Sequence, residues 1–392
     1  MPKKILLIVG GYSDKGVGEQ FLQGMLRDYS VESIYRYSPV FAEHKFNEDL
    51  HGYKTKTEVV PFSGRPIKSS IYYRKFVKSN LFGCVEQVNK LIKEKEINLV
   101  WIVLNSYHTI EIGSSFIDKL DIPVVTHIWD TPEYLCKSLR FDYYARMALL
   151  KSFSNLMLKA NRAVTVSKSM STIYADKYKI DSFPIVFCPP KEANRSVKLR
   201  SENGGIIKVV FAGSLYAYRE WNSFLDAVEY NNKTNEQKIE VVCIGNVSRW
   251  TRKRDWVKYE ALKPIEEAAT AVNDADVAYL PYWMSKKHAY TVKTAFPGKM
   301  SFYVASGTPV FFHGPKDSTP TEFLNEYKVG INCSSKKNDT ILEGINYLIS
   351  PEFQKEYQRE QEKTMNEVFH SDRIVELFDE TLRLALDSHK LN

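Results

Sequence analysis

Strand-like and helix-like segments alternate along this chain, and the alternation starts a second time after residue 205. Short apolar runs are separated by stretches in which apolar residues recur at helical spacing. This order is typical of a parallel sheet with helices packed on both of its faces. The expected strands cover residues 4–9, 31–37, 99–104, 123–128, 163–166, 206–211, 239–244, 277–280 and 309–312, and the expected helices include 19–26, 84–95, 112–119, 221–230, 265–272 and 341–349.

A hydrophilic break separates the two series of segments. Residues 187–205 contain two adjacent prolines, four Lys or Arg residues and two adjacent glycines, which is typical of a linker. We therefore predict an α/β protein with two Rossmann-like doubly wound domains facing a cleft, at residues 1–190 and 206–370. An amphipathic helix at 371–392 is expected to pack back on the N-terminal domain. Because ligands bind such sheets beyond the carboxyl ends of the strands, we expect the binding site in the cleft.

The charge is distributed unevenly along the chain. The 392 residues carry a net charge of +7, but residues 1–200 contain 30 Lys or Arg and 20 Asp or Glu. This excess indicates an anionic partner for the N-terminal half, such as a membrane surface, a lipid-linked phosphate or, least expected, a nucleic acid. A basic surface without any partner explains the excess equally well.

The cysteines and the apolar runs predict where the protein is found. The five cysteines, Cys84, Cys136, Cys188, Cys243 and Cys333, form no CxxC pair. We therefore expect neither a zinc site nor a disulfide framework, and we favour a reducing compartment. No apolar run reaches about 18 residues, so no membrane span is expected. The prediction is a cytoplasmic protein, peripheral at the inner face of the membrane if the basic half contacts lipid.

A glycine-rich loop follows the first expected strand at residues 10–18. Its glycines allow the backbone to approach a ligand closely, and Gly16 is a candidate contact. A dinucleotide fingerprint would require a third glycine at the position of Phe21, so we do not expect a dinucleotide cofactor. A substrate-contacting loop and a plain tight turn both remain open.

The strongest candidate site begins at Pro297-Gly298-Lys299. A turn at Pro297-Gly298 leads into an expected helix that ends before Gly307. Backbone amides at a helix N-terminus together with a lysine form a cradle for a diphosphate. We therefore predict that Gly298, Lys299 and Met300 contact the phosphates of a ligand.

A second loop, at residues 211–221, has the same potential. Arg219 lies where a helix begins, and a cation at that end of a helix is unfavourable unless an anion compensates for it. Arg219 and the neighbouring Ser214 are therefore candidate anion contacts. A solvated surface arginine is the alternative.

These segments resemble family-4-type glycosyltransferases of the GT-B fold. The resemblance rests on residues 275–282, on residues 297–309 and on the loop and helix at 213–227. It covers residues 207–335 well and residues 1–170 weakly. It implies transfer of a sugar from a nucleotide diphosphate sugar to a hydroxyl acceptor, and it favours retention of the anomeric configuration. Because no acidic pair appears at the end of an expected strand, we expect no metal.

The chain departs from the family pattern in the donor half. Ser214 stands where the family has a diphosphate-binding arginine, and Arg219 stands where it has a lysine. The family's Glu-x7-Glu motif is also altered, because the two glutamate positions hold Thr294 and Phe302. The ribose and sugar contacts that the family makes there are therefore not supplied by carboxylates.

A candidate acceptor segment lies at residues 126–133 in the N-terminal half. It resembles the part of the family that carries a His-Asp pair, with Asp130 at the aspartate position and Trp129 in place of the histidine. We predict that Asp130 or His127 contacts the acceptor, as a base if the reaction inverts. Capping of the next helix is the alternative role for Asp130.

Basic and aromatic residues are interleaved at 72–78 and 138–160. This pattern suits a membrane interface, and it would also suit nucleic acid. A helix with a core-facing side and a basic outer side is equally consistent with it.

The function predicted from the sequence is glycosyl transfer to a saccharide or lipid-linked acceptor, with bacterial surface polysaccharide assembly as the leading pathway. A nucleotide-sugar epimerase of the same architecture is one alternative. A binding module without activity is another, favoured by Thr294 and Phe302 at the glutamate positions.

Overall fold

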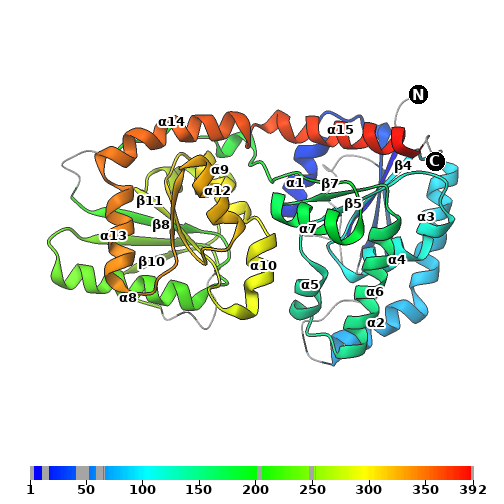
Figure 1. Ribbon diagram of the computed structural model, residues 1–392, viewed down its shortest axis with the longest axis horizontal. Helices are drawn as coiled ribbons and strands as arrows, with labels where there is room; N and C mark the ends of the chain where they lie inside the picture. Colours follow the sequence, from blue (N-terminus) through cyan, green and yellow to red (C-terminus); the bar gives the residue numbers. More distant parts are fainter. Residues whose placement is uncertain are drawn as a thin grey trace. The chain divides into compact units, whose positions relative to one another are not determined.

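The structure is a computed structural model that describes residues 4–10, 17–40, 53–58, 65, 67–200, 205–246, 251 and 253–389. The chain forms two compact units (Figure 1). Unit 1 comprises the described residues up to Val186 and from Ile374 onward, and unit 2 comprises those from Phe187 to Arg373. Both are parallel α/β sheets, which confirms the predicted fold class.

Unit 1 contains a sheet whose described strands follow the order β3-β2-β1-β4-β5-β6-β7 and are all parallel. The strand order reverses between β1 and β4, which is the topological switch point of a doubly wound sheet. The elements are β1 Ile5–Ile8, α1 Val17–Leu26, η1 Val31–Ser33, β2 Ile34–Val40, β3 Tyr53–Glu58, α2 Lys68–Ser79, α3 Leu81–Glu94, β4 Leu99–Val103, α4 Tyr107–Phe116, η2 Ile117–Lys119, β5 Val124–Ile128, α5 Pro132–Ser138, α6 Tyr143–Lys159, β6 Arg162–Thr165, α7 Lys168–Tyr178, β7 Ser182–Pro184 and α15 Ser371–His389.

The central strands of unit 1 are apolar because helices cover both of their faces. Every residue of β1, β4 and β5 is buried. A strand that is buried on both sides reads as a continuous apolar run rather than as an alternating one. This explains why these three strands were the easiest to predict from the sequence.

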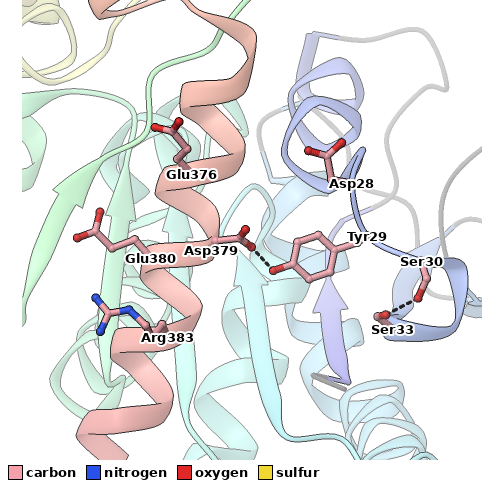
Figure 2. A pocket seen from close by; sticks show the side chains of 8 residues that line it. All are labelled: Asp28, Tyr29, Ser30, Ser33, Glu376, Asp379, Glu380 and Arg383. Carbon is pink, nitrogen blue, oxygen red and sulfur yellow. Dashed lines mark hydrogen bonds between the residues drawn. The ribbon is translucent and has the colours of Figure 1, made fainter. Parts of the chain in front are cut away.

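The C-terminal helix α15 packs on unit 1 from Ile374 onward. Its Phe378 ring lies 4.7 Å from the ring of Trp101 on β4 and 5.3 Å from that of Tyr29, between centroids. The Tyr29 hydroxyl donates a hydrogen bond to the Asp379 carboxylate (Figure 2). Aromatic burial and this hydrogen bond attach the helix to its unit.

Unit 2 repeats the same design. Its described strands follow the order β10-β9-β8-β11-β12-β13, all parallel, with the switch point between β8 and β11. The elements are η3 Lys191–Ala193, β8 Ile207–Ala212, α8 Tyr218–Thr234, β9 Ile239–Ile244, β10 Val257–Glu260, α9 Ile265–Asn273, β11 Val277–Pro281, η4 Lys286–His288, α10 Ala289–Thr294, α11 Gly298–Ala305, β12 Val310–His313, α12 Thr319–Tyr327, β13 Gly330–Cys333, α13 Asn338–Leu348 and α14 Pro351–Glu367.

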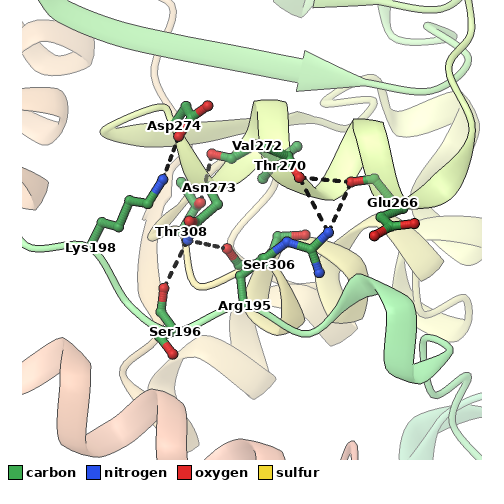
Figure 3. A network of polar contacts seen from close by, with 10 residues as sticks. All are labelled: Arg195, Ser196, Lys198, Glu266, Thr270, Val272, Asn273, Asp274, Ser306 and Thr308. Carbon is green, nitrogen blue, oxygen red and sulfur yellow. Dashed lines mark hydrogen bonds and ion pairs between the residues drawn. The ribbon is translucent and has the colours of Figure 1, made fainter.

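The polar segment before β8 is hydrogen-bonded to other parts of unit 2, so it is not a free linker. The Arg195 amide donates to the carbonyl of Ala305 (2.9 Å). The Asn273 amide group donates to the carbonyls of Ser196 (2.9 Å) and Ser306 (2.8 Å) (Figure 3). A Cβ at Gly307, whose φ is +74°, would lie 3.0 Å from the Asn273 side chain. Glycine therefore ends α11 where this segment crosses it.

Candidate functional site

The candidate donor site lies at the carboxyl end of β8, next to the switch point of unit 2. Gly213 directly follows β8 and Gly245 directly follows β9, and both have a φ of +118°. A Cβ at Gly245 would lie 2.4 Å from the carbonyl oxygen of Gly213. The two glycines therefore bring the loop backbones together in a conformation that other residues rarely adopt, at the edge where doubly wound sheets bind ligands.

Lys299 extends from the first turn of α11 across the loop after β8. Its Cε would lie 2.8 Å from a Cβ placed on Gly213. Its ammonium group lies 4.8 Å from the centroid of the Tyr216 ring and 5.7 Å from that of Phe211. The rings attract the cation, and burial lowers the pKa of Lys299 to about 8. A lysine shielded from water in this way binds an anion more strongly than a solvated one.

Tyr303 ties α11 to the end of β8. Its hydroxyl accepts a hydrogen bond from the amide of Ala212 (2.9 Å) and donates one to the carbonyl of the same residue (3.2 Å). The Tyr303 side chain is fully buried. This double contact fixes the start of α11, and with it Lys299, relative to Gly213.

The other predicted phosphate contacts fall into two groups. Ser214 and Arg219 are exposed, and Arg219 is the second residue of α8. Gly298 is the first residue of α11, whose N-terminus has no side-chain cap among the described residues. Met300 is different, because its side chain is fully buried and its amide donates to the carbonyl of Pro297 (2.9 Å). The Met300 side chain therefore packs in the core of unit 2, and its predicted phosphate contact stays a prediction.

The two positions that hold glutamate in the resembled family are occupied by side chains without charge. Thr294 is fully buried at the end of α10, and its hydroxyl donates to the carbonyl of Tyr290 (2.8 Å). Phe302 is partly buried on α11, with its ring beside that of Tyr303 (6.1 Å). Neither residue supplies the carboxylate with which the family accepts hydrogen bonds from a ribose or sugar hydroxyl.

An aromatic wall that the sequence analysis missed stands beside Lys299. Trp283 follows β11 and donates from its indole nitrogen to the carbonyl of Tyr216 (3.2 Å). The Tyr216 and Trp283 ring centroids are 4.6 Å apart, and His288 stacks on Trp283 at 4.4 Å with an angle of 12° between the planes. Flat aromatic surfaces of this kind bind sugar or base faces. An aromatic pair directly after an apolar strand was the signal available in the sequence.

A buried carboxylate supports this wall. Glu220, in the first turn of α8, accepts a hydrogen bond from the amide of Met284 (3.3 Å) and pairs with the ammonium group of Lys336 (3.0 Å). Its side chain is only 4% exposed. Glu220 therefore fixes the segment after β11 against α8, and removal of the Lys336 charge would leave the buried Glu220 carboxylate poorly compensated.

The predicted acceptor residues lie after β5 in unit 1 and have contrasting environments. The Asp130 side chain reaches solvent, but protein atoms crowd its loop, and this partial desolvation raises the pKa of its carboxyl to about 6. The adjacent Thr131 caps α5 by accepting from the amide of Tyr134 (3.2 Å). Helix capping, the alternative role for Asp130, is therefore performed by its neighbour.

His127 is fully buried on β5 and does not present a nitrogen to solvent. Its Nε2 accepts from the indole nitrogen of Trp129 (3.2 Å), and its ring packs edge-on against Phe21 and Trp101. Burial lowers the pKa of His127 to about 3, so the ring is neutral. The structure therefore favours a supporting role for His127 over direct contact with an acceptor.

The predicted glycine-rich loop is described only at its ends, and Gly16 lies outside the described residues. Gly10 donates from its amide to the side chain of Asn105 (3.0 Å) at the switch point of unit 1. A Cβ at Gly18 would lie 2.4 Å from the Trp129 ring. Gly18 is thus required for the packing of the segment that carries Asp130.

Two further observations limit the choice of site. The pocket beside α15 measures 920 Å³ and is lined by Asp28, Tyr29, Ser30, Ser33, Glu376, Asp379, Glu380 and Arg383 (Figure 2). Its four carboxylates outnumber its one guanidinium group, and this net negative lining is unfavourable for a nucleotide diphosphate. Within the described ranges, no group of three or more His, Cys, Asp or Glu residues is arranged to hold a metal ion, and no helix is both long and apolar enough to cross a bilayer.

Each unit is a doubly wound parallel sheet, which is the architecture of each half of the GT-B fold, and the likeness to solved structures assigns that fold. The sequence matches no family model and no curated protein. Solved structures do match. Sucrose-phosphate synthase from Thermosynechococcus elongatus has a TM-score of 0.71 at 11% identity, covering 98% of this chain and 100% of that one. Anabaena HepE in complex with UDP has a TM-score of 0.67 at 15% identity, covering 97% and 99%.

An epimerase shares the fold as well. A Listeria monocytogenes protein described as a UDP-N-acetylglucosamine 2-epimerase has a TM-score of 0.56 at 9% identity, covering 92% of this chain and 91% of that one. At these identities the likeness establishes the fold and does not by itself choose between the activities.

Proposed function

We propose that this chain is a glycosyltransferase that moves a sugar from a nucleotide diphosphate sugar to a hydroxyl acceptor. The observation that carries the proposal is Lys299, shielded at the N-terminus of α11 and laid across Gly213 at the switch point of unit 2. A lysine, helix amides and a close backbone turn together fit a diphosphate. HepE was solved with UDP, so uridine nucleotides are the first donors to test.

The chemical task of such a site is to stabilise the departing diphosphate. As the bond from the anomeric carbon to the phosphate oxygen breaks, negative charge grows on that oxygen. Lys299 and the amides at Gly298 would hold this charge, with Ser214 and Arg219 as exposed contacts on the neighbouring loop. The aromatic wall of Tyr216 and Trp283 would hold the sugar or the base without the family's carboxylates.

Asp130 is the proposed acceptor-side group. Its exposed carboxylate is ionised at neutral pH, given a pKa of about 6, and can accept the proton of an attacking hydroxyl. His127 would act through Trp129 by holding the segment in place. If the reaction retains configuration, Asp130 would bind and orient the acceptor instead.

The proposed acceptor is a saccharide, free or linked to a lipid, and bacterial surface polysaccharide assembly is the pathway that we propose. The support is the basic excess of the first 200 residues, which suits a phosphate-bearing lipid carrier or an anionic membrane surface. The location that we propose is the cytoplasm, peripheral at the inner face of the membrane.

The proposal is tested by thermal unfolding with a panel of nucleoside diphosphates and nucleotide sugars. A cognate nucleotide should raise the melting temperature, because a ligand bound only to the folded state stabilises it. If no nucleotide or nucleotide sugar shifts the transition, the donor site does not exist.

A product assay separates the alternatives. An epimerase converts the stabilising nucleotide sugar when no acceptor is present. A transferase only hydrolyses the nucleotide sugar slowly until an acceptor is added. A binding module would be stabilised by nucleotide and would convert nothing.

A further inference from the structure

Helices α2 and α6 of unit 1 each bury one side and expose another that is also apolar. Tyr73 and Phe76 of α2 and Leu149 and Phe153 of α6 fill the core. The opposite sides expose Ile71 (52%), Tyr143 (70%), Tyr144 (76%) and Met147 (49%). The apolar content of these helices is therefore greater than the core requires, and the surplus faces solvent.

The exposed sides of the two helices adjoin. The Ser70 hydroxyl of α2 accepts from the amide of Asp142, which caps α6 (2.9 Å). Arg74 of α2 pairs with the Asp142 carboxylate (2.6 Å). These contacts join α2 to the start of α6, and the two helices are neighbours in unit 1 (Figure 1). We name the combined surface the α2–α6 face; it consists of Ile71, Lys75, Lys78, Tyr143, Tyr144, Arg146 and Met147.

The α2–α6 face is basic as well as apolar. Neither α2 nor α6 contains an acidic residue, and between them they carry Lys68, Arg74, Lys75, Lys78, Arg146, Lys151 and Lys159. Arg74 is neutralised by Asp142, and Lys159 by Asp118. Lys75, Lys78 and Arg146 are exposed around the apolar side chains. The surface therefore combines a positive charge with an apolar centre.

We propose that the α2–α6 face docks on the surface of an anionic lipid bilayer. The tyrosines, Met147 and Ile71 would enter the headgroup region, where amphipathic aromatic side chains are stable. The lysines would contact lipid phosphates, each contributing to the electrostatic attraction. A nucleic acid fits less well, because it offers phosphates and base faces but no apolar environment for Ile71 and Met147.

The test is flotation of the full-length protein with vesicles of phosphatidylcholine alone or mixed with phosphatidylglycerol. The protein should float with the mixed vesicles and much less with the neutral ones. Lys75→Glu/Lys78→Glu should weaken partitioning by more than about 25-fold, because each lost lysine charge costs about fivefold and the two new carboxylates are repelled by the anionic lipid. Tyr143→Ser/Tyr144→Ser/Met147→Ser should weaken it by about tenfold.

Lys93→Glu/Lys119→Glu is the matched control, since it changes the net charge equally at two exposed lysines of unit 1 outside the face. It should float like the wild type. Equal loss in this control would show that net charge, and not the face, determines binding. Unchanged flotation of both face variants would overturn the proposal, and so would tight binding to DNA or RNA that vesicles do not compete away.

Folding and the donor site are checked separately. The donor residues belong to unit 2, so face variants should keep the wild-type melting temperature and its shift with nucleotide. A variant that loses both the wild-type melting temperature and its shift with nucleotide has lost its fold. The other face variant then decides whether the α2–α6 face docks on lipid. Flotation of a protein that no nucleotide stabilises would support the docking face while rejecting the proposed function.

Discussion

The loops at the carboxyl end of β8 in unit 2 and of β5 in unit 1 carry the two halves of the proposed chemistry, and they are built differently. The donor side has a shielded lysine, two glycines with positive φ and a tyrosine that ties helix to strand. The acceptor side has one exposed carboxylate supported by a neutral, buried histidine through Trp129. The comparison shows a loop held by several contacts on the donor side and a single exposed carboxylate on the proposed acceptor side.

Replacement of Asp130 with Asn should have the largest effect on turnover. Loss of the carboxylate should lower kcat by about 10²–10⁴ if it acts as the general base. Nucleotide affinity should not change, because Asp130 belongs to the other unit. The measurements are steady-state kinetics and nucleotide titration calorimetry. A kcat within a factor of about two of wild type would remove Asp130 from the catalytic groups.

Replacement of Gly213 with Ala should damage the donor side alone. The added Cβ would lie 2.8 Å from the Lys299 Cε in a backbone conformation unfavourable for alanine. Displacement of the lysine should weaken nucleotide binding by about 10- to 100-fold, the equivalent of losing a charge-assisted contact. Gly24→Ala, where an added Cβ meets nothing closer than 3.9 Å, is the control. Equal nucleotide affinity in Gly213→Ala and Gly24→Ala would contradict the claim that Gly213 and Lys299 together form the diphosphate site.

The pH dependence of nucleotide binding should distinguish the lysine from the rest of the cradle. Burial lowers the pKa of Lys299 to about 8, so the side chain is charged below that pH and neutral above it. Affinity for a nucleoside diphosphate should therefore be full below pH 8 and fall above it, by at most about tenfold per pH unit. Lys299→Arg, which stays charged, should abolish this fall. Identical profiles for the two proteins would show that another group titrates.

Replacement of Tyr303 with Phe should have the smallest effect, and on stability rather than on charge. It leaves the amide and carbonyl of Ala212 without their buried partner, which should cost about 1–3 kcal/mol in the free energy of unfolding. Nucleotide affinity should fall only modestly. Urea denaturation measures the first quantity; a loss below about 0.5 kcal/mol would show that Ala212 finds other partners.

The sequence was sufficient to predict the central strands but not the edges of either sheet. The expected runs correspond to β1, β2, β4, β5 and β6 in unit 1 and to β8, β9, β11 and β12 in unit 2. The strands it missed, β3, β7, β10 and β13, are the four edge strands. Edge strands are short or polar, as in the sequence YKTKTE of β3, so they lack the apolar run that marks a strand covered on both faces.

The candidate site was predictable where a motif is local and not where it depends on packing. Lys299 at a helix start could be read from the Pro-Gly-Lys run. Its position across Gly213 could not, because the two residues are far apart in the chain and meet through Tyr303. The burial of His127 and of Met300 depends likewise on neighbours from other strands and helices.

The central claim is that Lys299 forms the core of a diphosphate site. Calorimetric titration of Lys299→Met with the nucleoside diphosphate that stabilises the wild type tests it most directly, because methionine keeps the stem that packs over Gly213. Lys208→Met, at the amino end of β8, is the matched control. The claim predicts a loss of roughly 10²-fold in affinity for Lys299→Met and wild-type affinity for the control, with similar melting temperatures. Wild-type affinity in Lys299→Met would contradict it.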